Sequence, residues 1–329
     1  MSVFGTSSLE LMLTPITEPL ADPDVTEIVI NRPGEVGMER EGAWHWIDVP
    51  EFTFDRLDAI GILAGFALSK EFGPADPICL TTLPGGQRFT ACRPPATAGG
   101  LISFTIRVPS RVTSRVADDD FRNLLQEANR GHSRHAQTDA ELIRLYRAED
   151  WPAFFRLAVQ ARKTIGVTGR VGSGKTHVTR RLLRETPVHE RIVTIEDTDE
   201  FGPLPDHRNR VALFYGAAGV TAQQCAETSL RMRPDRVAMQ ELRGAESWAF
   251  LRVLASGHGG LTTWHSEAGA DAAFAALAKM SRSSGEASTY SDSELQQIFR
   301  GLIDIIAWCS RDSEGFSVPY VWFRAAEEA

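Results

Sequence analysis

The chain has 329 residues, of which 43% are hydrophobic and 24% are charged, a balance typical of globular proteins and a length that favours about two domains. The net charge of −8 argues against a bulk electrostatic attraction to nucleic acid or to an anionic membrane. Because no uncharged apolar stretch reaches about 18 residues and the N-terminus lacks a basic segment, we expect neither a transmembrane helix nor a signal peptide, and we predict a cytoplasmic protein.

The first third of the chain predicts a small α+β domain. Helical apolar spacing covers residues 7–20 and 54–70. Runs of β-branched and alternating residues predict strands at 26–31, 36–39, 44–49, 78–83, 87–93 and 101–108. Together these elements predict an N-terminal α+β domain over residues 1–109.

After this domain the chain is first polar and then shows alternating patterns of strands and helices. Residues 110–137 are polar and mixed in charge, and we interpret them as a linker, with a binding arm as the alternative. Strands are predicted at 164–169, 191–195, 237–240 and 261–265, and helices at 151–161, 176–184 and 246–256. This alternation predicts an α/β domain over residues 138–329, with a parallel sheet whose ligands bind at the carboxyl ends of its strands.

One glycine-rich turn in this domain matches the phosphate-binding pattern Gly-x-x-x-x-Gly-Lys-Thr, between a predicted strand and a predicted helix. Glycines let the backbone direct its N–H groups at phosphates, and the helix N-terminus adds partial positive charge. Lys175 is expected to reach the β- and γ-phosphates of ATP, and the Thr176 hydroxyl is expected to bind Mg²⁺. The residues predicted to hold the nucleotide are Gly169, Val171, Gly172, Ser173, Gly174, Lys175, Thr176 and His177.

Carboxylates follow two of the predicted strands. Glu196 and Asp197 come directly after the strand at 191–195, and we expect them to help hold Mg²⁺ and to orient water; a solvated acidic turn is the alternative. Glu241 ends the strand at 237–240 and is expected to activate the attacking water or to bind the metal through water. The alternative for Glu241 is a helix cap.

Two histidines, His258 and His265, flank the strand at 261–265. Their spacing does not suit a metal-binding pair on one helix, and the sequence offers no third ligand beside them. We therefore expect His265 to sense the γ-phosphate by a hydrogen bond to the phosphate or to the catalytic glutamate. A buried core histidine is the alternative.

These motifs, in this order, resemble those of the traffic ATPases of bacterial secretion, and most closely those of the hexameric ATPase of type IV secretion and conjugation systems. The matching segments are Gly169–Thr176 (Walker A loop), Ile195–Glu200 (Asp box), Leu230–Gly244 (Walker B region) and Ser256–His265 (His box). Phe104–Ser110 is similar to the strand and linker entry that precede the motor domain in that family. The resemblance implies an α/β fold with a RecA-like P-loop motor domain and a smaller N-terminal α+β domain.

The resemblance also implies an assembly and an activity. Family members form homohexameric double rings with ATP between the two domains, and arginines of the N-terminal domain approach the phosphates: Arg107 first, with Arg88 and Arg93 as further candidates. The implied function is a Mg²⁺-dependent ATPase that powers pilus assembly and the export of protein or DNA. The implied partners are other ATPases and inner-membrane components of the secretion channel, at a peripheral location on the cytoplasmic face of the inner membrane, without stable nucleic-acid binding.

Three alternatives to this function stay open at the level of sequence. They are a type II secretion or type IV pilus ATPase, a nucleic-acid translocating RecA-like motor, and a nucleotide-gated scaffold with little turnover. The chain also departs from the family pattern at Arg170 and Gln240, where a glycine is usual, at His177, where threonine is usual, and at Trp264 and Ser266 beside His265. These positions are where the geometry of the site is expected to differ.

Overall fold

The structure is a computed structural model that describes residues 3–109 and 136–329. The described residues divide into two compact units: 3–109 with 188–240, and 136–187 with 241–329. The predicted linker lies outside the described residues, except for its last two residues, which begin a helical segment over 136–147. The first unit thus combines the predicted N-terminal domain with a piece of the predicted motor domain, and the domain boundaries at 109 and 138 stay a prediction.

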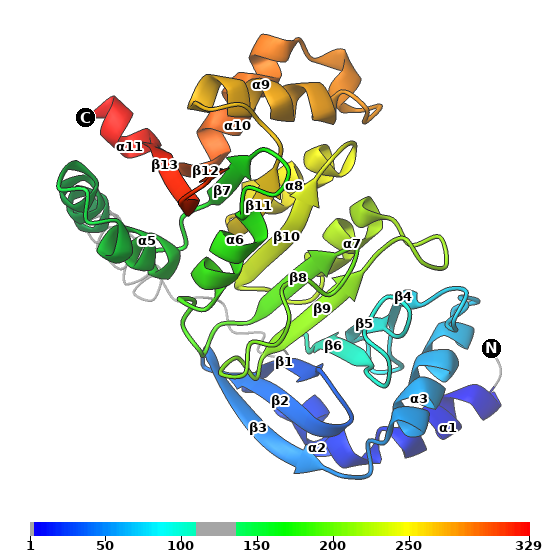
Figure 1. The fold of residues 1–329 in the computed structure, drawn as a ribbon. Coiled ribbons are helices and arrows are strands. Elements are labelled where there is room, and N and C mark those ends of the chain that lie inside the picture. The colour runs from blue at the N-terminus through cyan, green and yellow to red at the C-terminus, as the bar shows by residue number, and fades with distance from the viewer. Residues whose placement is uncertain (1–2, 110–135) are drawn as a thin grey trace, which may run out of the picture. The chain divides into compact units, whose positions relative to one another are not determined.

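The N-terminal part of the first unit is a six-stranded antiparallel sheet with helices packed on it (Figure 1). Its elements are α1 (Val3–Met12), η1 (Thr14–Ile16), α2 (Thr17–Ala21), β1 (Val25–Ile30), β2 (Gly34–Arg40), β3 (Ala43–Val49), α3 (Phe54–Phe66), β4 (Ile78–Thr82), β5 (Arg88–Cys92) and β6 (Ser103–Arg107). The strand order is β3-β2-β1-β6-β5-β4, so all six predicted strands are confirmed.

The two predicted helices of this region are shorter than expected. The helix predicted over 7–20 is wrong as a single element, because a 3₁₀ turn over Thr14–Ile16, which contains Pro15, separates α1 from α2. The second helix ends at Phe66, and Ser69 adopts a left-handed conformation with φ 55°. Phe66 and Leu68 are 72% and 49% exposed. The helical spacing of apolar residues in the sequence therefore extends past the residues that pack on the core.

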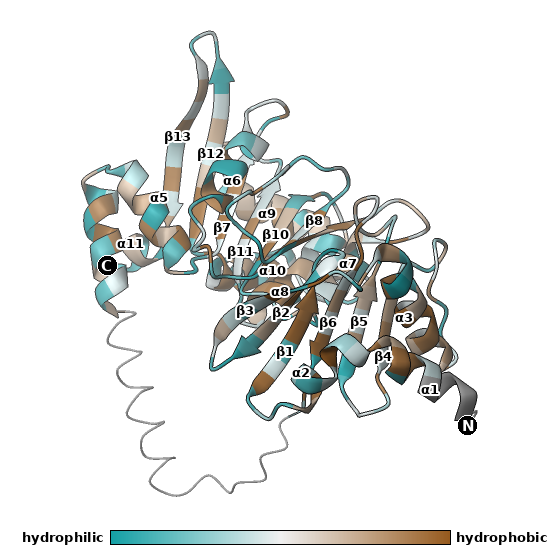
Figure 2. Ribbon diagram, turned by 90° about the horizontal axis from the view of Figure 1, so that it is seen from below, coloured by the Kyte–Doolittle hydropathy of each residue, from teal (hydrophilic) through white to brown (hydrophobic). Residues whose placement is uncertain are grey.

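Apolar residues of the central strands form the core of this sheet. In Figure 2, β1 is coloured as hydrophobic over most of its length, and Ile28 and Ile30 of that strand are fully buried. The rings of Phe89 and Phe104, on neighbouring strands β5 and β6, pack edge to face with centroids 4.7 Å apart. Such aromatic pairs add specific geometry to apolar burial and fix the register of the two strands.

The rest of the first unit consists of parallel strands in the order β10-β8-β9 and one helix. These elements are β8 (Ile192–Glu196), β9 (Arg210–Phe214), α7 (Ala222–Ser229) and β10 (Arg236–Leu242), the last two residues of which belong to the second unit. Thr221 caps α7 by accepting a hydrogen bond from the Gln224 amide. Strand β9 was not predicted.

A fully buried arginine connects these strands to the N-terminal sheet. The Arg191 guanidinium donates hydrogen bonds to Asn31 and Asn209, to the Met232 carbonyl at 2.6 Å and to the Thr105 hydroxyl at 3.2 Å. Burial lowers the pKa of Arg191 to about 10, which still leaves the side chain charged at neutral pH. A buried charge with this many hydrogen bonds holds segments that are far apart in sequence at fixed positions within the unit.

The second unit is an α/β layer structure around the strand order β13-β12-β7-β11. Its elements are α5 (Trp151–Gln160), β7 (Ile165–Gly169), α6 (Lys175–Leu183), α8 (Glu246–Ala255), β11 (Gly259–Trp264), α9 (Ala270–Ser281), η2 (Ala287–Thr289), α10 (Asp292–Leu302), β12 (Ile305–Asp312), β13 (Gly315–Phe323) and α11 (Arg324–Glu328). Strand β7 runs parallel to β11 and β12, whereas β12 and β13 form an antiparallel hairpin. The predicted strands at 164–169 and 261–265 are confirmed, and the hairpin was not predicted.

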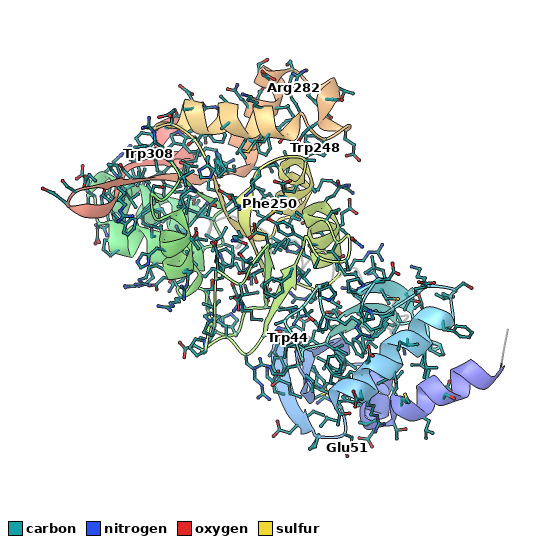
Figure 3. The ribbon with its side chains drawn as sticks, turned by 45° about the vertical axis from the view of Figure 1, so that its right-hand side comes forward. Trp44, Glu51, Trp248, Phe250, Arg282 and Trp308 are labelled. Carbon is teal, nitrogen blue, oxygen red and sulfur yellow. The ribbon has the colours of Figure 1, made fainter. Side chains whose placement is uncertain are left out.

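Helix α8 illustrates how this unit separates its core from its surface (Figure 3). Phe250 is 1% exposed, whereas Trp248 on the same helix donates its indole N–H to Glu286 at 2.8 Å and lies against the ring of Tyr290. Within residues 3–109 and 136–329, every helix is too short or too polar to cross a lipid bilayer.

Candidate nucleotide-binding site

The glycine-rich turn joins a buried strand to a helix, as predicted. All five residues of β7 are buried, and α6 begins directly at Lys175. The turn needs its glycines, because Gly172 and Gly174 have φ of 72° and 89°, and a Cβ on Gly169 would lie 2.3 Å from the Cys309 carbonyl oxygen. No side chain of the described residues caps α6 at Gly174, and the partial positive charge of a helix N-terminus favours an anion there.

The other residues of the loop differ in exposure. Ser173 is buried and its hydroxyl has no hydrogen-bond partner among the described residues, which suits a group that faces a ligand oxygen. Val171 is 85% exposed at the tip of the loop, Thr176 is half-buried and His177 is exposed. Arg170, which replaces a glycine of the family pattern, points to the surface and pairs with Glu267 at 2.7 Å.

Lys175 is held by a small set of oxygen and nitrogen atoms. Its Nζ donates to the carbonyls of Gly169 and Arg170 at 3.3 and 3.2 Å and lies 3.0 Å from Nδ1 of His265. Lys175 is 8% exposed, and burial lowers the pKa of its ammonium group, while the nearby Glu241 carboxylate opposes that shift. A buried ammonium at the start of a helix with no side-chain cap is well placed to meet phosphate oxygens.

Glu241 and His265 lie next to this lysine. The fold thus brings together three residues that belong to three separate sequence motifs. Nε2 of His265 is 2.8 Å from Oε1 of Glu241, and the second oxygen of that carboxylate pairs with Arg243. The side chains of Glu241 and His265 are 13% and 45% exposed, so neither is a core residue. Among the described residues no side chain caps α8, whose N-cap is Ala245, so Glu241 does not act as its cap; Glu246, the first residue of the helix, accepts from the amides of Arg243 and Gly244 before it.

The acidic segment after β8 belongs to the first unit, and hydrogen bonds to Glu196 hold it in place. Glu196 is fully buried and accepts hydrogen bonds from the Thr194 hydroxyl at 2.6 Å and from the amides of Glu200 and Phe201 at 3.1 and 2.9 Å. Burial raises the pKa of Glu196, although these hydrogen bonds oppose the shift. Glu196 therefore shapes the loop that follows it, and the half-buried Asp197 is the carboxylate nearer the surface.

Gln240 explains one departure from the family pattern. Its side-chain oxygen accepts a 2.8 Å hydrogen bond from the amide of Asp197, and the residue is 3% exposed. A glycine at this position has no side chain to make that bond. In this chain the acidic loop is consequently attached to the strand that ends in Glu241.

The candidate arginines of the N-terminal domain have different surroundings. Arg107 is 56% exposed and pairs with Glu27 at 3.1 Å, so its guanidinium lies at the surface of the sheet. Arg88 is its cross-strand neighbour and is exposed. Arg93, by contrast, pairs with Asp58 and lies over the rings of Phe54 and Phe72, which makes it part of the packing of α3.

Trp264 explains a second departure. The residue is fully buried, and its indole N–H donates to the Ala273 carbonyl on α9 at 3.0 Å. A Cβ on Gly166 would lie 2.1 Å from the tip of the indole ring, so the bare glycine of β7 is what makes room for the tryptophan. The ring thus fits between the strand that leads into the phosphate loop and the helix that follows His265.

We expect Gly166→Ala to destabilise the protein by about 1–3 kcal/mol, because the added methyl group overlaps a ring that has no free space to enter. Thermal unfolding measures the effect. Gly301→Ala on α10 is the matched control, since a Cβ there meets no atom within 4 Å. A Gly166→Ala protein that unfolds at the wild-type temperature would contradict this packing.

Several residues near the site were missed by sequence reasoning. The β12–β13 hairpin brings Phe316 against Gly174, and the turn residues Asp312-Ser-Glu-Gly315 were a hairpin signal in the sequence. The roles of Glu246 and Gln240 as hydrogen-bond acceptors for backbone amides carried no comparable signal, because their partners depend on the folded backbone.

Comparison with known proteins shows the family of the chain. The family model "Type II/IV secretion system protein" matches residues 133–311. The type IV secretion system protein VirB11 of Brucella suis is 34% identical over 335 aligned residues, which cover 96% of this chain and 90% of the relative. This chain belongs to the type II/IV secretion system protein family.

Two further relatives of this family extend the comparison. Protein VirB11 of Agrobacterium fabrum is 35% identical over 326 residues, covering 96% of this chain and 94% of the relative. The crystal structure of the VirB11 ATPase from the Brucella suis type IV secretion system, in complex with sulphate, matches with a TM-score of 0.88 and 32% identity over 99% of both chains. The predicted fold, an α/β RecA-like P-loop motor with a smaller N-terminal domain, is confirmed, and the family supports a nucleotide-using secretion ATPase.

Proposed function

We propose that this protein is a Mg²⁺-dependent ATPase whose hydrolysis cycle powers pilus assembly and substrate export through a type IV secretion system. The observation that carries the proposal is the set of Lys175, His265 and Glu241 at the N-terminus of α6, where none of the described side chains caps the helix. The likeness to VirB11 proteins over almost the whole chain favours type IV over type II secretion. The acidic net charge of −8 does not favour a nucleic-acid motor.

In this proposal, each residue of the site has one task. The backbone N–H groups of Gly172 and Gly174, with the Lys175 ammonium, bind the β- and γ-phosphate oxygens and neutralise the charge that develops during transfer. Glu241 accepts a hydrogen bond from the attacking water and orients it. His265, already bonded to that carboxylate, holds it in place and contacts the γ-phosphate when nucleotide is present.

The residues present fit a Mg²⁺ ion. Among the residues described, no group of three or more His, Cys, Asp and Glu side chains is arranged to hold a metal by itself. Mg²⁺ at a nucleotide needs only one or two protein ligands, because phosphate oxygens and waters complete its octahedron. We propose Thr176 and Asp197 as those ligands and Glu196 as the residue that positions Asp197; the bound ion would withdraw charge from the phosphates.

The assembly of the protein is part of the same proposal. We propose a homohexameric ring, with Arg107 contributing a guanidinium to the phosphates as in the family it resembles. The expected partners are other ATPases and inner-membrane components of the secretion channel, at a peripheral location on the cytoplasmic face of the inner membrane.

Phosphate release and light scattering test this function together. We expect phosphate release from ATP that requires Mg²⁺ and stops with a chelator, and a hexamer in the presence of ATP. Wild-type protein that releases no phosphate above background would favour a nucleotide-gated scaffold. A strict monomer with and without ATP would count against the ring, and a salt-sensitive increase of the rate with DNA would support a nucleic-acid motor.

A further inference from the structure

The β12–β13 hairpin places an aromatic ring beside the phosphate loop. Figure 2 shows this hairpin as a long two-stranded arm, and Phe316 lies near its tip at the start of β13. A Cβ on Gly174 would lie 2.7 Å from Cδ1 of Phe316, so the ring contacts the bare backbone of the last glycine before Lys175. The left-handed conformation of Gly174 and this contact both exclude a side chain there.

The ring is accompanied by a cation and is open to a ligand. Arg311 is the cross-strand partner of Phe316, and its guanidinium carbon lies 4.8 Å from the ring centroid. Phe316 is 57% exposed, so more than half of a large apolar side chain faces away from the protein next to the turn that binds phosphate. A planar ring and a planar cation in contact form a surface on which another planar group can stack.

We infer that Phe316, with Arg311, is the stacking platform for the nucleobase of the bound nucleotide. This inference rests on the proposed function, since it needs the β- and γ-phosphates to be held at the N-terminus of α6. Only the α-phosphate and the ribose separate the base from the β-phosphate. A base on a nucleotide held by the phosphate loop can therefore reach a ring that contacts that loop.

This platform has a consequence for substrate choice. A ring recognises the face of a base and does not distinguish the hydrogen-bonding groups along its edge, so base–aromatic stacking tolerates a change of base. The platform therefore takes purine nucleoside triphosphates as a class. ATP and GTP bind with affinities within about five-fold of each other, and CTP, with its smaller ring, binds about ten-fold more weakly.

Binding of ATP and of inorganic tripolyphosphate, measured by calorimetry with Mg²⁺, tests the inference apart from catalysis. Phe316→Leu keeps an apolar side chain against Gly174 but removes the planar ring. We expect it to weaken ATP binding about ten-fold and to leave tripolyphosphate binding unchanged. Phe316→Trp retains ATP binding, and its fluorescence is quenched by ATP and not by tripolyphosphate.

Other outcomes would overturn the inference. Wild-type affinity of Phe316→Leu for ATP would show that the ring does not contact the base, and equal loss of ATP and tripolyphosphate binding would mean that it only supports the loop. A preference of wild-type protein for ATP over GTP above about a hundred-fold would contradict recognition by the base face alone. Wild-type protein that binds tripolyphosphate but gains nothing from the base would refute the platform only, whereas failure to bind either compound would refute the proposed function.

Discussion

Replacing Lys175 by alanine is expected to abolish ATP turnover, with a fall in kcat/KM of at least about a thousand-fold. The ammonium group is the buried cation at the start of α6, and its Nζ is surrounded by two loop carbonyls and His265. In the proposed site, removing it takes away a charge-assisted hydrogen bond to the phosphates in surroundings of low dielectric constant, where such bonds have large effects. Phosphate release under saturating ATP, together with calorimetric binding of ATP, measures the loss.

Lys279→Ala is the matched control for this variant, because Lys279 is an exposed lysine in the last turn of α9. It should leave both binding and turnover at wild-type values. The loop also uses Lys175 to satisfy the carbonyls of Gly169 and Arg170, so thermal unfolding of Lys175→Ala must be compared with wild type. A folded Lys175→Ala protein with more than a tenth of wild-type turnover would contradict the proposed site.

Glu241→Gln should preserve ATP binding while slowing hydrolysis by about 10²–10⁴-fold. The substitution keeps the shape of the side chain and removes its ability to accept a proton from water, which is the contribution expected of a positioned general base. Calorimetric affinity and single-turnover hydrolysis separate the two effects. Glu328→Gln, at an exposed position in α11, is the control for removal of a carboxylate.

Two results would count against this role for Glu241. A decrease in single-turnover rate of less than about five-fold would mean that another group activates the water. A loss of ATP binding equal to the loss of rate would mean that Glu241 holds His265 and Arg243 in place without taking part in the chemistry.

Local pattern predicted the elements that carry the chemistry, because each motif follows a short buried strand. The strands before Gly169, Glu196, Glu241 and His265 are all present as β7, β8, β10 and β11. The glycine conformations of the phosphate loop follow from residue type as well, since Gly172 and Gly174 both have positive φ. These features depend on residues that are adjacent in the chain, so they can be predicted from the sequence alone.

Contacts between distant segments were not predictable in the same way. Lys175 and His265 are separated by 90 residues, and their 3.0 Å approach depends on the pairing of β7 with β11. Arg93 was a further candidate for phosphate after Arg107, and its contacts with Asp58 and two rings place it within the packing of α3. A sequence pattern shows residue types and their spacing. It does not show which charged side chains form ion pairs in the folded protein.

The hairpin and the helix ends were missed for a different reason. Residues 315–319 are all exposed or half-buried, so the first half of β13 has little of the buried apolar pattern that identifies a strand. The predicted extension of α3 beyond Phe66 failed because apolar residues there face solvent. Hydrophobic spacing predicts an element well where the element packs on a core and poorly where it does not.

The hydrogen bond from the Asp197 amide to Gln240 has a consequence for how work is transmitted. Strands β8 and β10 are already paired up to Ile195 and Met239, and the buried Gln240 side chain adds a contact from β10 to the loop just beyond that pairing. The next residue along the strand is Glu241. We therefore expect the loop that begins at Asp197 to follow any displacement of the end of β10.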